Sequence, residues 1–373
     1  MLECEILTSE TEIEKLADEW RRLHARVGRS SYTDYDLFVI WWRVLAKSDG
    51  RQSLHVIAGR RDGSLVGVLP LTIARRKGLR ILYAAGHKGY YYCDMLAEDA
   101  DIATALWNAA CRSPHYDFAD IRDVYPESMC YKALCAFAQR HDITGAFYVR
   151  LNWRTGKDWI ASLPGNVRGK FKRCTRRLEE KGAVRYEVYE TGPLPAAIID
   201  GMVEKKIAWS AVHDKHGLFD YPDVLRFFHL TLETAARQGR LFLAWLRCGD
   251  DVIAYNYGLI HHGILHISFW TYDPAWAQYS PGNVIMVHSI CRAIDHGLRN
   301  VELGQGGSFF KRQYCNETRS CDEFTFSGSR RGRLLEAAFI GLRTVWRFLT
   351  RMKLDENYTQ SAKPTAGETP DRP

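Results

Sequence analysis

The sequence lacks the signatures of several common chemistries. None of its 10 cysteines forms a CxxC pair, and no group of cysteines and histidines has zinc-finger spacing. Its 13 histidines include no HExxH motif, and neither GxSxG, a P-loop nor a dinucleotide-binding fingerprint is present. Metal-dependent and nucleoside-triphosphate chemistry are therefore disfavoured, and no metal cofactor is expected.

Long apolar runs are also missing. No stretch reaches the roughly 20 apolar residues that a membrane-spanning helix needs. The first 16 residues, MLECEILTSETEIEKL, are acidic and lack the apolar core of a signal peptide. Scattered cysteines without a secretion signal fit reduced thiols. We therefore expect a cytoplasmic protein.

The composition that is present is that of a folded globular protein. The chain has 373 residues, of which 46% are hydrophobic and 25% charged, enough for about two domains with their own cores. The formal net charge is +7. This mild basic bias suits an anionic ligand such as a nucleotide cofactor, and equally a nucleic acid or an acidic membrane.

The order of the expected elements repeats once along the chain. Each half reads as helices, an antiparallel meander, a helix, a strand, a helix and a strand. This order predicts an α/β (α+β) fold of two tandem lobes, each a mixed, mostly antiparallel sheet flanked by helices. The expected boundaries are 1–152 for the first lobe, 153–328 for the second, 329–354 for an amphipathic helix and 355–373 for a disordered tail.

Local signals refine this outline. Asp62-Gly63 predicts a hairpin turn, and Pro70 predicts an edge or a bulge in a strand over 65–73. A helix is expected at about 127–140 and a short strand at 323–326. A basic helix is expected from Trp159 to Lys181, with a solvated face or a face that grips an anion.

The expected helix over 331–353 has one apolar side, and basic residues surround the rest. Two interpretations stay open. The helix packs on the domain, or it lies on a membrane surface. The second interpretation would make the protein peripheral at the inner membrane.

Four segments between Trp159 and Phe326 carry a resemblance to a known family. In chain order they are RGKFKRCTRRLEEKG at 168–182, GDDVIAYNYG at 249–258, YDPAWAQYSPG at 272–282, and ELGQG at 302–306 leading to Phe310-Lys311. They resemble the GCN5-related N-acetyltransferase (GNAT) superfamily, in the branch found in cellulose and exopolysaccharide gene sets. They are also similar to the Fem-type aminoacyl transferases of peptidoglycan biosynthesis.

The resemblance weakens toward the N-terminus, where 31–42 and 86–96 are similar to the family's aromatic helix and its segment from glycine to an acidic residue. At several positions this sequence also departs from the residues that are usual in the family. Glu302 stands where Asp is usual, Phe310 stands where Tyr is common, and 278–282 keeps only part of the donor-binding loop.

The resemblance implies transfer of an acyl group from acyl-coenzyme A to an amine, with Glu302, Tyr272 and Lys311 as catalytic residues. Glu302 could act as base or bind the acceptor ammonium, or only pair with a neighbouring cation. Tyr272 could reprotonate the leaving thiolate, or it could only line the wall. Lys311 could bind an anionic group of donor or acceptor, or it could be a solvated lysine.

Ser280-Pro281-Gly282 reads as a helix start. Ser280 can cap the helix, Pro281 suits its first position, and Gly282 leaves room for a ligand. A helix N-terminus favours an anion, so the donor pyrophosphate is expected here, although an ordinary capped helix gives the same pattern. The expected donor-binding residues are Gln278, Ser280, Gly282 and Asn283.

We expect the first lobe to face the acceptor, with Asp94, Tyr92 and Trp209 as substrate-binding residues. The resemblance implies an acceptor amine on a small-molecule or lipid-linked precursor of the envelope or of a polysaccharide, or on an amino acid. Two rival functions remain. One is a Fem-like transferase that uses aminoacyl-tRNA, and the other is a non-catalytic protein that accompanies a polysaccharide synthase.

Overall fold

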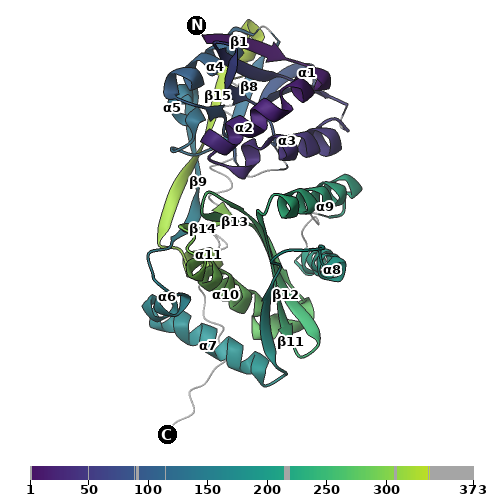
Figure 1. Ribbon diagram of the computed structural model, residues 1–373, viewed down its shortest axis with the longest axis vertical. Helices are drawn as coiled ribbons and strands as arrows, with labels where there is room; N and C mark the ends of the chain where they lie inside the picture. The colour runs from purple at the N-terminus through teal and green to yellow at the C-terminus, as the bar shows by residue number, and fades with distance from the viewer. Residues whose placement is uncertain are drawn as a thin grey trace.

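The computed structural model describes residues 2–48, 50–87, 89, 92–113, 115–213, 219–305, 309–334 and 336. Two lobes are stacked along the long axis of the molecule, with the N-terminus at the far end of the upper lobe (Figure 1). Helices flank the sheets of both lobes, which confirms the expected mixed α/β fold.

The first part of the chain forms the upper lobe and ends in a long strand. Its elements are β1 (Leu2–Leu7), α1 (Glu10–Lys15), α2 (Ala17–Val27), η1 (Ser31–Thr33), α3 (Tyr35–Trp41), η2 (Trp42–Ala46), β2 (Gln52–Leu54), β3 (Val56–Arg61), β4 (Ser64–Leu69), β5 (Leu71–Arg76), β6 (Leu79–Ala84), β7 (Leu96–Ala97), α4 (Ala100–Arg112), β8 (Phe118–Val124), α5 (Met129–Cys135) and β9 (Gln139–Arg150).

The second part forms the lower lobe and returns to the upper one. Its elements are α6 (Gly156–Ser162), α7 (Gly165–Glu179), β10 (Val184–Val188), α8 (Ala196–Val212), α9 (Pro222–Arg237), β11 (Leu241–Cys248), β12 (Asp251–His261), β13 (Ile264–Tyr272), η3 (Pro274–Tyr279), α10 (Pro281–Asp295), β14 (Asn300–Gln305), α11 (Phe309–Arg312) and β15 (Glu317–Ser327).

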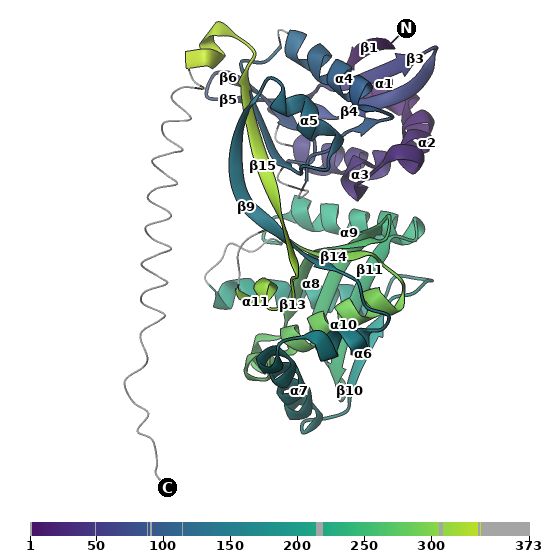
Figure 2. The same ribbon diagram turned by 90° about the vertical axis from the view of Figure 1, so that its left-hand side faces the viewer.

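One large sheet runs through both lobes. Its 11 strands have the order β10-β11-β12-β13-β14-β9-β15-β8-β6-β5-β2, and a separate 4-stranded sheet, β1-β3-β4-β7, completes the upper lobe. The long strands β9 and β15 lie side by side between the lobes (Figure 2).

The arrangement about β9 and β15 is an exchange of strands. β9 follows β8 and α5 in the upper lobe but pairs with β14, whereas β15 follows β14 and α11 but pairs with β8. Each half of the chain therefore supplies the last strand of the other half's sheet. The strand expected at 323–326 is part of β15, which begins at Glu317 because it must reach from one lobe to the other.

The helices of the lower lobe cover opposite faces of the sheet. Val287 and Ile290 on α10 are fully buried against Trp159 of α6 and Val301 of β14. On the other face, Met202 and Leu232, from α8 and α9, pack under the same strands. Each buried apolar side chain of this size contributes about 1.5–3 kcal/mol to folding, so the strands between these helices are firmly held.

Several local predictions are confirmed and others are wrong. Asp62 and Gly63 form the β3–β4 turn with φ of 51° and 79°, as a tight hairpin requires. The single strand expected over 65–73 is wrong. Pro70 separates β4 from β5, which lie in different sheets, because proline offers no N–H to a ladder.

Two helix predictions also need correction. The helix expected from Trp159 to Lys181 is two helices, α6 and α7, because Pro164 cannot continue a helix from α6. The helix expected over 127–140 is only α5, and β9 begins at Gln139.

The predicted C-terminal helix over 329–354 lies almost entirely outside the described residues, as does the tail from 355. Within the part of the chain that the structure describes, no helix combines the length and apolar character needed to cross a membrane.

Candidate active site

Two parallel strands of the lower lobe, β13 and β14, diverge after a short ladder. β13 and β14 pair only over 264–266 and 300–302, and the ladder ends at the pair His266–Glu302. Beyond it a cavity of about 560 Å³ opens between the strands. Ligands of open α/β sheets typically bind at the carboxyl ends of diverging strands.

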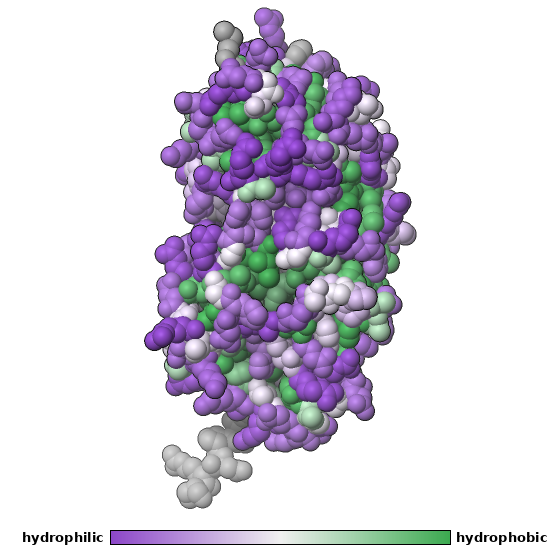
Figure 3. Space-filling view, in the orientation of Figure 1, coloured by the Kyte–Doolittle hydropathy of each residue, from purple (hydrophilic) through white to green (hydrophobic). Residues whose placement is uncertain are grey.

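The walls of this cavity are largely apolar. The residues that line it are Lys170, Lys206, Trp209, Ile267, Ser268, Phe269, Trp270, Tyr272, Ala277, Ser280, Gly282, Asn283, Leu303, Gly304, Gln305, Phe310 and Lys311. In Figure 3, hydrophobic side chains show in a hollow of the lower half of the molecule, bordered by hydrophilic ones. Apolar walls with a few polar groups are typical of pockets for small molecules.

A bulge brings Ser268 to this cavity. The pairing of β12 with β13 shifts between Tyr257 and Gly258, which leaves Ser268 as the extra residue on β13. Gly258 is needed here, because a Cβ at this position would come within 2.4 Å of the His266 carbonyl oxygen. Bulges commonly redirect a strand beside an active site.

The start of α10 forms another wall. Ser280 adopts a left-handed conformation with φ of 53° and ψ of 50°, and its side chain caps no N–H group of the helix. The expected Ser280 cap is therefore wrong, because capping side chains act from an extended backbone. The helix N-terminus, with its partial positive charge, is not neutralised by its own first residue.

Gly282 leaves space at this helix start. A Cβ at Gly282 would lie 3.3 Å from Cδ1 of Tyr272, which also lines the cavity. Asn283 is buried, and its Oδ1 accepts a hydrogen bond of 2.5 Å from the Tyr314 hydroxyl. Gln278 is exposed on η3 and is not among the residues that line the cavity.

Three lysines from three helices line the cavity. Lys170 comes from α7, Lys206 from α8 and Lys311 from α11. The Lys311 ammonium donates to the carbonyl of Gln305, and burial lowers the pKa of Lys311. Lysines that converge on one apolar-walled cavity favour an anionic ligand.

A buried polar cluster lies at the closed end of the divergence. Glu302 is 1% exposed, and its Oε1 accepts a hydrogen bond of 2.7 Å from the Tyr125 hydroxyl. The Tyr148 hydroxyl donates to that of Tyr125, also at 2.7 Å. Nδ1 of His266 is hydrogen-bonded to Oε2 of Glu302.

Burial sets the protonation of this cluster. It raises the pKa of Glu302 well above the ordinary carboxyl value and lowers the pKa of His266 to about 4. Both shifts favour an uncharged pair with one proton between the carboxyl and the imidazole. Nε2 of His266 has no hydrogen-bond partner among the described residues. An imidazole held at Nδ1 by a carboxyl group can exchange a proton at Nε2.

The structure separates the acceptor residues that the sequence predicted. Trp209 lines the cavity beside Lys206, but Asp94 and Tyr92 do not. Asp94 accepts backbone N–H groups of Met95 and Met129 at 2.8 and 2.9 Å, and burial raises its pKa to about 6. It thus fixes the start of α5.

Tyr92 lies on the upper side of the buried cluster. Its ring centroid is 4.2 Å from that of Tyr125, the residue that donates to Glu302. Tyr92 therefore contacts the cluster from the upper lobe and does not face the cavity between β13 and β14.

Sequence reasoning missed His266, Tyr125 and Tyr148, and also the lysines at 170 and 206 as lining residues. His266 had a signal, because it interrupts the apolar strand 264–269 with a polar side chain. Tyr125 had none, because only the fold brings it to Glu302, 177 positions later. No cluster of His, Cys, Asp and Glu suited to a metal occurs within the described residues.

Residues 165–312 match a family model described as an acetyltransferase (GNAT) domain. This segment contains the cavity, the start of α10 and the His266–Glu302 pair. A comparison with curated protein sequences finds no match.

Solved structures share the fold across most of the chain. FemX superposes with a TM-score of 0.56 at 10% identity, covering 78% of this chain and 94% of that one. The C-terminal domain of a putative lysylphosphatidylglycerol synthetase from Agrobacterium fabrum gives 0.55 at 14% identity, with coverage of 88% and 96%. L-PGS from Bacillus licheniformis gives 0.54 at 11% identity, with coverage of 88% and 96%. The chain thus shares its fold with these structures, and its residues 165–312 match the GNAT acetyltransferase domain.

Proposed function

We propose that this protein is an N-acyltransferase that takes its acyl group from a coenzyme A thioester and transfers it to an amine. The observation that carries the proposal is the cavity between β13 and β14. It extends from the uncapped start of α10 to the strand positions next to the His266–Glu302 pair. It therefore joins an anion site at the helix start to Ile267 and Leu303, the chain neighbours of the His266–Glu302 pair.

The residues present fit such a donor. The space above Gly282, which a Cβ would narrow against Tyr272, suits a pyrophosphate at a helix N-terminus. Lys170 and Lys311 add positive charge to the same cavity. The thioester, when bound, supplies an activated acyl carbon, and the apolar side chains of Ile267 and Leu303 line the same cavity.

The transfer forms a carbon–nitrogen bond and breaks the thioester carbon–sulfur bond, so the amine loses a proton and the thiolate gains one. In our proposal Glu302 first loses its proton, Nδ1–H of His266 then donates to the carboxylate, and Nε2 takes the amine proton. The raised pKa of Glu302 makes its carboxylate a stronger base toward that imidazole. Tyr272, on the donor side of the cavity, gives a proton to the thiolate.

The acceptor class is inferred from resemblance. The four segments from 168 to 311 resemble acetyltransferases of cellulose and exopolysaccharide gene sets. We propose an acceptor amine on an envelope or polysaccharide precursor, or on an amino acid. Trp209 and Lys206, whose ammonium lies 4.4 Å from the Trp209 ring centroid, form the wall that such an acceptor would meet.

A Fem-like transferase with an aminoacyl-tRNA donor is the second candidate. The fold likeness to FemX and the basic face of α7 favour it. The basic residues of α7 are Arg168, Lys170, Lys172, Arg173, Arg176 and Arg177. Binding of tRNA through this face would weaken steeply with salt.

Calorimetric titration of the protein with coenzyme A and a series of acyl-coenzyme A thioesters tests the proposal. We expect saturable binding that Gly282→Trp weakens by about 100-fold or more, since the added ring occupies the donor site. Ala100→Trp is the matched control, because it places the same ring on the exposed start of α4.

A folded protein that binds no thioester would contradict the proposal. Binding of aminoacyl-tRNA by that sample would then identify the Fem-like function. Binding of neither donor would favour a non-catalytic role.

A further inference from the structure

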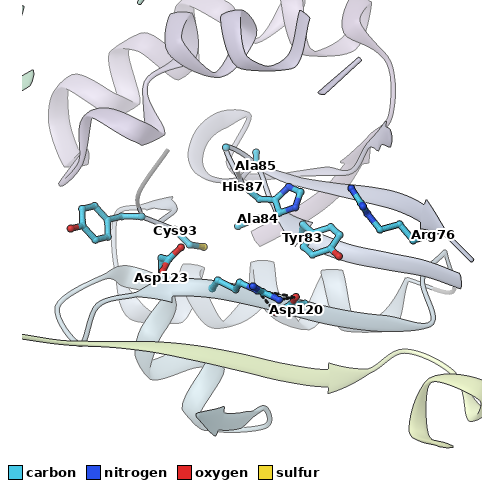
Figure 4. A pocket seen from close by; sticks show the side chains of 11 residues that line it. Arg76, Tyr83, Ala84, Ala85, His87, Cys93, Asp120 and Asp123 are labelled. Atoms are coloured by element: carbon cyan, nitrogen blue, oxygen red, sulfur yellow. Dashed lines mark hydrogen bonds and ion pairs between the residues drawn. The ribbon is translucent and has the colours of Figure 1, made fainter. Parts of the chain in front are cut away.

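The upper lobe contains a second divergence of parallel strands. β6 and β8 pair only over 81–82 and 118–119, and a cavity of about 280 Å³ lies beyond these pairs. Two carboxylates of β8, Asp120 and Asp123, lie along one side of it (Figure 4). The lower cavity is lined by three lysines and, within the described part of the chain, by no carboxylate. Of the two cavities, the lower one therefore has the charge that suits an anionic ligand.

Basic side chains continue from the lower cavity along α7. Lys170 lines the cavity, and Arg173, Arg177 and Lys181 follow it at intervals of three or four residues. Because residues at this spacing share one side of a helix, these four side chains form a row, which we call the cavity row. Arg173 and Arg177 lie about 5 and 10 Å further along the helix axis than Lys170, at about 1.5 Å per residue. The positive charge of the cavity therefore extends well beyond its wall.

Contacts with η3 fix the direction in which the cavity row faces. Leu178 of α7 and Tyr279 of η3 belong to one apolar cluster. The guanidinium carbon of Arg177 lies 5.2 Å from the centroid of the Tyr279 ring, and the Lys181 ammonium lies 5.9 Å from it. Tyr279 directly precedes Ser280, which lines the cavity at the start of α10. The cavity row therefore runs beside the helix start that we propose as the pyrophosphate site.

The cavity row differs from the other basic side chains of the same helix. A second row lies on another side of α7 and consists of Arg168, Lys172 and Arg176. In this second row, Arg168 donates to the carbonyl of Ala161 at 2.6 Å, and Arg176 pairs with Glu180 at 3.6 Å. Among the described residues, the four cations of the cavity row have no carboxylate partner. Their charge is therefore available to a bound anion.

The placement of the two rows favours one kind of anion. A coenzyme A thioester has a pyrophosphate and, on the ribose of its nucleotide, a separate 3′-phosphate. With the pyrophosphate at the start of α10, the second phosphate meets the side of α7 that faces η3, and this side carries the cavity row. A long polyanion such as tRNA would engage both rows, since its phosphates continue past a single side of the helix.

We propose that Arg173 and Arg177 bind the 3′-phosphate of the donor, and that they thereby select coenzyme A thioesters over thioesters whose pantetheine arm lacks this phosphate. A guanidinium group suits this role, because it pairs with two phosphate oxygens at once and stays charged at physiological pH. This inference rests on the proposed function. It adds the residues that determine which thioester carrier the enzyme accepts.

Calorimetric titration of the full chain with coenzyme A and with 3′-dephospho-coenzyme A tests this inference. The two probes differ only in the 3′-phosphate, so the ratio of their dissociation constants isolates the contribution of that group. We expect the unaltered protein to bind coenzyme A at least tenfold more tightly, as charge-assisted hydrogen bonds from two arginines allow. Equal affinity for the two probes would overturn the inference.

Two double variants of α7 locate the phosphate. Arg173→Ala with Arg177→Ala should reduce the preference for coenzyme A to within about twofold, while the affinity for 3′-dephospho-coenzyme A stays the same and thereby reports an intact donor cavity. Lys172→Ala with Arg176→Ala is the matched control, because it removes the same charge from exposed positions of the same helix. It should leave the preference unchanged. An equal loss of preference in both variants would indicate a general effect of net charge and would overturn the inference.

The same titrations separate this inference from the proposed function. Binding of both probes with equal affinity would overturn the 3′-phosphate site alone and leave the coenzyme A donor in place. Binding of neither probe by a folded sample would contradict the proposed donor, and this inference would fall with it. In that case, aminoacyl-tRNA binding that both double variants weaken would assign the basic side chains of α7 to the Fem-like function.

Discussion

The two diverging strand pairs occupy equivalent places on either side of β9 and β15, but they end differently. In the lower lobe the last pair of the ladder is His266–Glu302, and in the upper lobe it is Leu82–Ala119. Helix α10 of the lower lobe starts after Ser280 without a side-chain cap, whereas the carboxylate of Asp99 caps α4 of the upper lobe.

This difference shows what topology supplies and what side chains supply. A short parallel ladder that opens produces a cavity in both lobes. Among the described residues, the lower cavity differs from the upper one in lying at a helix start without an acidic cap and next to the buried His266–Glu302 pair. The fold therefore offers two cavities, and in our proposal particular residues assign the donor to the lower one.

The largest expected effect, a loss of kcat, comes from substitutions of the His266–Glu302 pair. We expect Glu302→Gln and His266→Asn each to lower kcat by about 10²–10⁴-fold, the usual contribution of general acid–base catalysis, with donor affinity unchanged. Steady-state kinetics with the acceptor, together with thioester titration, measures both quantities.

Asp322→Asn is a matched control from the upper lobe. Asp322 is also 1% exposed, and it accepts a hydrogen bond of 2.6 Å from the Tyr131 hydroxyl. Its replacement should leave kcat within about twofold of the unaltered enzyme. An equal loss of kcat in Asp322→Asn and Glu302→Gln would show that any buried carboxyl change disturbs turnover, and the contrast between the lobes would fail.

Acid sensitivity should sharpen the comparison. The pKa of His266 is about 4 in the folded protein and 6.5 in its ordinary state, so the unfolded chain binds more protons between these values. Stability therefore falls as pH falls from 6.5 to 4, by about 3 kcal/mol for this residue. Urea unfolding at several pH values measures this dependence. In His266→Gln, the free energy of unfolding should fall less between pH 6.5 and 4.

His55 is the upper-lobe counterpart for this measurement, because it is buried and its pKa is also about 4. His55→Gln should likewise reduce the loss of unfolding free energy at acid pH, but it should leave turnover unchanged. Loss of turnover in His55→Gln would contradict the assignment of the chemistry to the lower lobe.

The smallest expected effect compares the two helix starts. Asp99→Ala removes a side-chain cap and should destabilise the protein by about 1 kcal/mol. Ser280→Ala removes no such hydrogen bond and should change stability by less than about 0.5 kcal/mol. Chemical denaturation measures both values, and a larger loss from Ser280→Ala would show that its hydroxyl has a structural role.

The sequence by itself determined most local elements of the lower lobe. Alternation and turn residues marked β11, β12 and β13, and Pro281 marked the start of α10. These signals are local, since hydrophobic period, proline and glycine act on neighbouring residues. The resemblance of the segment at 272–282 also pointed to Tyr272 and Gly282, which line one cavity in the structure.

The tertiary structure alone decided the exchange of β9 and β15 and the cluster around Glu302. His266 meets Glu302 across 36 positions and Tyr125 meets it across 177, and no local pattern encodes such pairs. It also decided that Ser280 would not cap its helix and that Asp94 would fix α5, since both depend on the backbone conformation reached on packing. Sequence patterns specify which residues form an element, whereas the pairing of distant elements depends on the buried surface of the whole chain.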